Sequence, residues 1–206
     1  MNSADAQPTD DLEVIPARTA GWAAVEAVLS AEATSRDCWC QFHLLSNAEW
    51  RETSRESRHA LLQEQIESSD SPRGLVALRG GTPVGWCGVE PRVRLRHVTA
   101  SRLVVKESPF ALEDDRVWSI YCLLVPPAHR RQGVAEGMLS AAITHARASG
   151  ATALEGYPVD AAARGGKLPS GFSTGTLSMF ERHGFEAVAS LPSARTLVVR
   201  SIGLSD

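Results

Sequence analysis

The sequence predicts a domain of the α/β class, in its α+β form, with a central mixed, mostly antiparallel sheet and flanking helices. A strongly apolar run over residues 117–125 has the composition of a strand that is buried on both faces. An amphipathic helix follows over residues 133–149, and shorter apolar runs with turn residues between them occur elsewhere in the chain. The 206 residues fit one domain, which we expect to span residues 12–206.

The first half of this domain has the pattern of a strand, two helices and a hairpin. Thr19 is a suitable N-cap for the first helix, whose apolar residues recur at helical spacing. Ser46 and Glu49 have the spacing of a capping box, which opens a second, polar helix. The turn sequence Gly-Gly-Thr-Pro connects the two strands of the hairpin. The predicted ranges are, in order, 12–17, 20–29, 46–66, 75–78 and 84–89.

The second half alternates strands with helices. Residues 92–115 begin basic and end acidic, and we expect a long excursion between two strands there. Gly150 suits the C′ position of the helix before it, and Gly184 followed by Phe185 suits a Schellman stop. The remaining elements are a strand at 153–159, a loop at 159–171, a helix at 174–183, and strands at 185–190 and 196–202.

The composition excludes several classes of protein. The formal net charge is −3, so no overall basic field favours nucleic acid or a membrane surface as a partner. No apolar run approaches the ~20 residues of a membrane helix, and residues 1–11 form a polar, acidic lead-in without a signal-peptide core, which we expect to be disordered. Four cysteines are too few for a disulfide framework, which favours a cytoplasmic protein with reduced thiols.

Residues 129–135 read His-Arg-Arg-Gln-Gly-Val-Ala, between the apolar strand and the amphipathic helix. The first N–H groups of a helix lack partners within the helix, and the macrodipole adds partial positive charge there. Such a site can bind a pyrophosphate. The segment lacks the paired glycines and lysine of a nucleoside-triphosphate loop, and it is not the three-glycine dinucleotide fingerprint.

Three features in order resemble the GNAT superfamily of N-acetyltransferases. The apolar strand leads into Arg130, Gly133 and Ala135, which match the family's acyl-CoA pyrophosphate loop, and a helix and strand follow. Residues 179–185, Met-Phe-Glu-Arg-His-Gly-Phe, look like the family's Tyr-Glu-Lys-x-Gly-Phe segment. The chain further resembles a bacterial branch of that superfamily in three segments: Cys-Trp-Cys at 38–40, Gly-Trp-Cys at 85–87 and Tyr-Pro-Val-Asp at 157–160.

The resemblance implies the GNAT acyl-CoA N-acyltransferase fold, with fourth and fifth strands that splay apart to admit acyl-CoA. It implies an acyltransferase that moves an acetyl group from acetyl-CoA to a primary amine of a small molecule, by direct attack in a ternary complex. Two alternatives stay open: a protein N-acetyltransferase, and a catalytically inactive CoA-binding sensor module. A homodimer also stays open.

The resemblance places the cofactor along the end of the fourth strand, the following loop and the last helix. The strand end would pair with the pantetheine arm, as in strand addition, and the loop would hold the pyrophosphate, where a side chain on the glycine would block close approach. The expected cofactor-binding residues are Leu123, Leu124, Val125, Arg130, Arg131, Gln132, Gly133, Val134, Ala135, Ser173, Thr174 and Phe180.

The chain departs from the family at the catalytic positions. Phe180 stands where the family has its tyrosine acid, and Ser119 stands near the glutamate base of the histone-acetylating branch. We therefore expect Glu155 as the base, acting directly or through water, with Asp160 just past the strand end as a second carboxylate. The proton donor would be water, Tyr157 or Ser178. Glu155 and Tyr157 are two residues apart on a strand and share a face. A solvent-facing Glu155 is equally open, and packing is the more usual role of a residue like Tyr157.

Aromatic residues suit the wall of an acceptor pocket, and the candidates are Trp39, Phe42 and Trp86, together with Ser119. Core packing is the alternative for the aromatic residues. The cluster Cys38-x-Cys40-x-x-His43 has the wrong spacing for a zinc knuckle. We expect its thiols to pack as small apolar groups and expect no metal.

Overall fold

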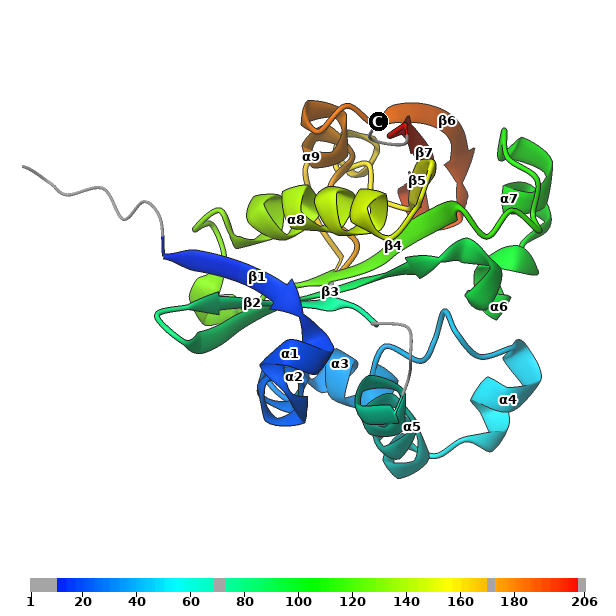
Figure 1. Ribbon diagram of the computed structural model, residues 1–206. Coiled ribbons are helices and arrows are strands. Elements are labelled where there is room, and N and C mark those ends of the chain that lie inside the picture. The colour runs from blue at the N-terminus through cyan, green and yellow to red at the C-terminus, as the bar shows by residue number, and fades with distance from the viewer. Residues whose placement is uncertain (1–10, 69–72, 170–172, 204–206) are drawn as a thin grey trace, which may run out of the picture.

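The computed structural model describes residues 11–68, 73–169 and 173–203, and its centre is a seven-stranded sheet (Figure 1). The strand order is β1-β2-β3-β4-β5-β7-β6, and β4 with β5 is the parallel pair among antiparallel neighbours. The predicted α+β class is therefore confirmed. The strands are β1 (Leu12–Pro16), β2 (Leu75–Arg79), β3 (Thr82–Pro91), β4 (Val117–Leu124), β5 (Ala153–Gly156), β6 (Glu186–Leu191) and β7 (Arg195–Ser201).

Helices cover both faces of this sheet. In Figure 1, α8 and α9 lie on one face, and α1 to α5 lie on the other. Each face has its own apolar core, one under α8 and α9 and one under the N-terminal helices. The helices are α1 (Ala17–Ala20), α2 (Trp22–Leu29), α3 (Ala33–Cys38), α4 (Asn47–Glu52), α5 (Arg55–Ser68), α6 (Arg96–Thr99), α7 (Arg102–Glu107), α8 (Val134–Ala148) and α9 (Leu177–Arg182). Four 3-10 turns connect them: η1 (Arg92–Arg94), η2 (Pro127–His129), η3 (Ala162–Arg164) and η4 (Pro192–Ala194).

The helix stops follow the predicted chemistry. Gly150 (φ +87°) and Gly184 (φ +74°) adopt the left-handed conformation after α8 and α9. After α9, the N–H of Phe185 donates to the carbonyl of Phe180 (3.1 Å), and the two rings pack 4.9 Å apart. This is the Schellman pattern with its apolar contact. The equivalent bond after α8 runs from Ala151 to Ala146 (2.9 Å).

Three predictions in the N-terminal half are corrected. Thr19 lies inside the short α1, and Gly21 (φ +82°) precedes α2, because the chain turns into a helix directly after β1. The capping box of Ser46 and Glu49 is present, but its helix ends at Glu52 and α5 begins at Arg55. The interruption follows from the extended backbone of Thr53 (ψ 133°). Helix α3 was not predicted, since its six residues carry no apolar stripe.

The excursion at 92–115 contains η1, α6 and α7, which lie over one end of the sheet beside β4 and β6. The predicted lead-in lies outside the described residues except for Asp11, as do residues 170 and 171 of the predicted loop at 159–171. In the described ranges, no helix has the length and apolar character needed to cross a membrane.

The fourth and fifth strands separate as expected. β4 pairs with β5 at Val117–Ile120, and the pairing stops there although β4 continues to Leu124. On its other side, β4 stays paired with β3 through Leu124. A V-shaped gap in the backbone pairing therefore opens beside residues 121–124, at the edge of the sheet where α8 begins.

Candidate functional site

The N-terminus of α8 is arranged to receive an anion. Gly133 is the N-cap in the left-handed region (φ +77°), and no side chain caps the helix, so no side chain engages the N–H groups of its first turn. The first helical bond runs from the N–H of Gly137 to the carbonyl of Gly133 (2.9 Å). A Cβ built at Gly133 meets nothing within 4 Å, so the space in front of these N–H groups is open. This geometry fits a phosphate group.

The side chains of the loop before α8 are less available than predicted. The Nε of Arg130 donates to the carbonyl of Val125 (2.9 Å), and its Nη2 pairs with Glu32, which lies between α2 and α3. Gln132 is held by Arg79 through its side-chain oxygen (2.6 Å) and its carbonyl (3.0 Å). Arg131 is exposed, in the left-handed region (φ +58°). Arg131 therefore remains the loop's accessible cation.

Two other predicted cofactor contacts are corrected at the splay of β4 and β5. The N–H of Leu123 donates to the carbonyl of Ser173 (2.6 Å), so this N–H is engaged within the chain. Phe180 is fully buried. Its ring fills the space above Gly156, where an added Cβ would come within 2.4 Å of it. The phenyl group therefore belongs to the core under the splay and has no surface for a cofactor.

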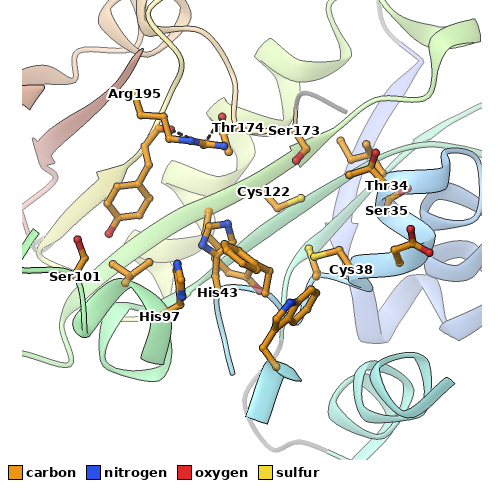
Figure 2. A pocket seen from close by; sticks show the side chains of 18 of the residues that line it. Thr34, Ser35, Cys38, His43, His97, Ser101, Cys122, Ser173, Thr174 and Arg195 are labelled. Carbon is orange, nitrogen blue, oxygen red and sulfur yellow. Dashed lines mark hydrogen bonds between the residues drawn. The ribbon is translucent and has the colours of Figure 1, made fainter. Parts of the chain in front are cut away.

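A cavity of about 580 Å³ lies on the face of the sheet that the N-terminal helices cover, against the splay of β4 and β5 (Figure 2). Leu124 and Ser173 from the splay form part of its wall, and α3, the α3–α4 connection, α6, α7 and the start of β7 enclose the rest. Its size is typical of sites for small ligands. The chemistry-bearing lining residues are Glu32, Thr34, Ser35, Asp37, Cys38, Cys40, His43, His97, Ser101, Tyr121, Cys122, Tyr157, Ser173, Thr174 and Arg195.

His43 is the notable polar group in this wall. Burial lowers the pKa of His43 to about 3, and the nearby charges of Arg195 and His97 contribute, so the imidazole is neutral at physiological pH. Its Nδ1 is buried and has no hydrogen-bond partner in the described part of the chain. Such an orphaned nitrogen is costly unless a ligand bonds to it.

Two cysteines in the wall, Cys38 and Cys40, have raised pKa values and therefore stay protonated. Burial raises the pKa of Cys38 to about 11, and a hydrogen bond with Cys122, together with burial, raises that of Cys40. Trp86 Nε1 also donates to Cys40 Sγ (2.9 Å). No group of three metal-binding side chains occurs within the described ranges.

Glu155, the predicted base, does not line the cavity. Its carboxylate is fully buried behind the cavity wall, where it pairs with Arg92 Nη1 (2.6 Å) and accepts from Ser108 Oγ (2.5 Å). Tyr157 donates its hydroxyl to the same carboxylate (3.0 Å) and contacts Ser119 Oγ (3.2 Å). Burial raises the pKa of Tyr157 well above its usual range, and the charge of Glu155 adds to the shift. Glu155 thus holds the hydroxyl of Tyr157, a residue that lines the cavity.

The structure separates the other predicted site residues. Ser178 is exposed on α9 with its hydroxyl near Thr176 Oγ1 (3.3 Å), outside the cavity lining. Phe42 lines the cavity. Trp39, Trp86 and Ser119 do not: the two indoles pack in the N-terminal core, and Ser119 lies behind Tyr157. Thr174 lines the cavity and is bonded to Arg195.

Sequence reasoning missed Arg195 altogether. Arg195 follows a turn between two short strands, a position that carries no motif, and only the packing of β7 beside β5 brings it to the cavity. His43 stood out in the sequence only as part of the cluster Cys38-x-Cys40-x-x-His43, where we expected no metal. Asp160 was considered as a base, but its side chain accepts from the N–H groups of Ala162 and Ala163 (2.9 and 3.1 Å) and caps η3.

Comparison with known proteins identifies the family. The family model "Acetyltransferase (GNAT) family" matches residues 39–165, more than half of the chain. No curated protein matches the sequence.

Solved structures agree in fold at low identity. PaiA N-acetyltransferase from Thermoplasma acidophilum, in complex with coenzyme A, is 14% identical with a TM-score of 0.53, over 93% of this chain and 99% of that one. YncA from Salmonella typhimurium, with its cofactor acetyl-CoA, is 14% identical with a TM-score of 0.57, over 95% and 96%. A GCN5-related N-acetyltransferase from Kribbella flavida is 17% identical with a TM-score of 0.52, over 93% and 98%. The chain therefore belongs to the GNAT family of acetyltransferases.

Proposed function

We propose that this protein transfers the acetyl group of acetyl-CoA to the amine of a small molecule bound in the cavity. The observation that carries the proposal is that the cavity reaches the splay: Leu124 ends β4, the carbonyl of Ser173 accepts from the N–H of Leu123, and both Leu124 and Ser173 line the cavity. A thioester held at the splay would therefore face an acceptor in the cavity. Proximity of this kind supplies a large part of the rate enhancement in group transfer.

The residues that would hold acetyl-CoA are those of the splay and of the α8 N-terminus. The uncapped N–H groups at Val134 and Ala135 would bind the pyrophosphate, with Gly133 allowing close approach. Arg131 would add charge-assisted bonds, and Leu124 and Val125 would run beside the pantetheine arm. Bound acetyl-CoA supplies the activated acetyl group, as a thioester open to attack by an amine.

The cavity residues would prepare the amine. An amine attacks only when it is neutral, and removal from water favours the neutral form. The walls are mostly apolar, with Phe42, Val98 and Val104 among them. The neutral imidazole of His43 lines the cavity and would place no positive charge beside the amine. Tyr157, held by Glu155, would fix the opposite wall.

The cofactor site is tested by Gly133→Glu. The glutamate side chain would occupy the open space before α8 and repel phosphate, so the melting temperature should no longer rise with acetyl-CoA. The free energy of unfolding of the wild-type protein should rise by about 2.7 kcal/mol when acetyl-CoA is present at 100 times its Kd.

Gly150→Glu is the matched control, because Gly150 (φ +87°) follows the same helix and also faces open space. Both variants carry a left-handed strain of about 1–2 kcal/mol, and only Gly133→Glu should lose the response. An unchanged response would show that the cofactor binds elsewhere.

Turnover separates the enzyme from a sensor. Thiol release from acetyl-CoA over a panel of small amines and peptides should show saturable activity with small amines. Binding of acetyl-CoA without thiol release for any amine would support a sensor, and activity confined to peptides would support a protein acetyltransferase.

A further inference from the structure

Arg195 brings a cation to the cavity, and neither of the acidic residues that line it, Glu32 and Asp37, is its ion-pair partner. Its Nη1 donates to Thr174 Oγ1 (3.0 Å) and to the carbonyl of Tyr157 (3.3 Å), both neutral acceptors. Among the residues that the structure describes, no carboxylate lies within ion-pair distance of Arg195. The two other arginines near the cavity differ in this respect, since Arg130 pairs with Glu32 and Arg92 with Glu155.

The surroundings of Arg195 leave room for an anionic ligand. The guanidinium is partly buried, burial lowers its pKa, and the two bonds to the chain hold Nη1. A charge held partly out of water without a partner is costly, and an anion relieves that cost. The carboxylate of Glu155 does not line the cavity and is already paired, so it does not compete for Arg195. The planar guanidinium matches a carboxylate in two-point geometry.

The position of Arg195 fits an acceptor that spans the cavity. Figure 2 shows Arg195 and Thr174 on one side, His43 and His97 across from them, and Cys122 of β4 beside the gap. Arg195 and His43 line the same cavity, and the charge of Arg195 helps to lower the pKa of His43. A molecule bound by Arg195 at one end would thus present its other groups to His43 and to the splay.

We propose that the acceptor is a small amine that carries a carboxylate, as amino acids do, with that carboxylate bound by Arg195. The apolar lining, with Phe42, Trp50 and Val104, favours an apolar or aromatic body on this molecule. The inference rests on the proposed function, because it concerns the acceptor of the same site. Arg195 is here a specificity residue: it selects the acceptor and takes no part in the bond changes.

The test compares acceptors that differ in one group: phenylalanine, phenylalaninamide and 2-phenylethylamine, with further amino acids treated in the same way. In the wild-type protein, kcat/KM measured by thiol release should be at least tenfold higher for the carboxylates than for the amides. In Arg195→Gln the preference should fall to near one, mainly through a higher KM for the carboxylates. Arg195→Lys should restore part of it.

Arg102→Gln is the matched control, because it removes the same charge from an exposed position. Arg102 begins α7 and follows the cavity-lining Ser101. It should keep the wild-type preference. Equal turnover of carboxylates and amides in the wild type would overturn the inference and leave the proposed function standing. An equal loss for every acceptor in Arg195→Gln would also overturn it, since Arg195 would then have only a structural role.

Binding of the product gives a readout that needs no turnover. N-acetylphenylalanine should bind the wild-type protein and bind Arg195→Gln at least tenfold more weakly, while its amide should bind both alike. Absence of binding by every amino or N-acetylamino carboxylate would overturn the inference, whatever acetyl-CoA does. Absence of acetyl-CoA binding alone would overturn the proposed function.

Discussion

A single histidine, His43, illustrates how the cavity controls charge. The imidazole is enclosed between the α3–α4 connection and the sheet, with Arg195 and His97 nearby. A proton on His43 would add a second positive charge beside that of Arg195 in a poorly solvated place. The fold therefore keeps this histidine neutral.

The neutral state of His43 should make the free energy of unfolding depend on pH. The pKa of His43 is lowered from 6.5 to about 3, so between these values the unfolded chain binds a proton that the folded chain does not. Stability is therefore complete above pH 6.5 and falls as the pH decreases toward 3, by at most about 5 kcal/mol from this residue. His43→Gln should remove this part of the acid sensitivity, measured as urea unfolding at several pH values.

The control for this prediction is His129→Gln, which removes a histidine from the partly exposed η2 turn. It should leave the acid profile of the wild type unchanged. If His43→Gln and wild type lose stability in parallel from pH 7 to pH 3.5, then His43 does not resist protonation in the folded protein.

At the scale of elements, the side chain of Phe180 packs α9 against β5. Its ring contacts Gly156 of β5 and Gly175 before the helix, and it packs on Phe185 after the helix. The family's tyrosine at this place would need a partner for its hydroxyl, whereas a phenyl ring needs none. A phenyl ring therefore suits this tightly packed position over a strand glycine.

Gly156→Ala should accordingly be destabilising. The new Cβ would come within 2.4 Å of Phe180 Cε1, so the ring would have to move, at a cost of about 1–3 kcal/mol. Adding Phe180→Leu should recover part of the loss, because the smaller side chain relieves the clash, and chemical denaturation of the four species would give the coupling energy. Additive effects of the two substitutions would show that Phe180 does not constrain Gly156.

Which elements could be predicted depended on where their signals lie. The capping box of Ser46, the stops at Gly150 and Gly184 and the apolar β4 are written in adjacent residues, and all are present. Helices α3, α6 and α7 are four to six residues long, and their packing against the sheet stabilises them, so periodicity did not show them.

The candidate site follows the same division. Gly133 could be predicted, because strand, loop and helix are contiguous around it. Arg195 and His43 could not, because residues 152 positions apart reach one cavity only after the sheet has formed. Glu155 was assigned to the right strand but to the wrong surroundings, since nothing in the local sequence reveals that Arg92 is its partner.

At the scale of the whole molecule, the ion pair of Arg92 and Glu155 joins two distant parts of the chain. Both side chains are fully buried, and Nη1 of Arg92 lies 2.6 Å from Oε1 of Glu155. Arg92 also donates to Ser108 Oγ (2.8 Å) and to the carbonyl of Ala111. These contacts attach the excursion at 92–115 to β5, and the excursion in turn carries the Ser101 and Val104 wall of the cavity.

Replacing one partner of this pair should therefore destabilise the protein strongly. Replacing both partners together should destabilise it much less. Arg92→Met or Glu155→Leu leaves one buried charge alone, and each should lower the free energy of unfolding by about 3–5 kcal/mol. The double variant should regain most of that loss, because no buried charge is left unpaired. Urea unfolding of the four proteins measures the coupling.

Arg116→Met is the control, since the Arg116–Asp114 pair lies at the surface close to the same segment. Its loss should change the free energy of unfolding little. A double variant with the summed loss would mean that the two side chains contribute independently. The cavity would then owe its shape to packing around each residue and not to the ion pair.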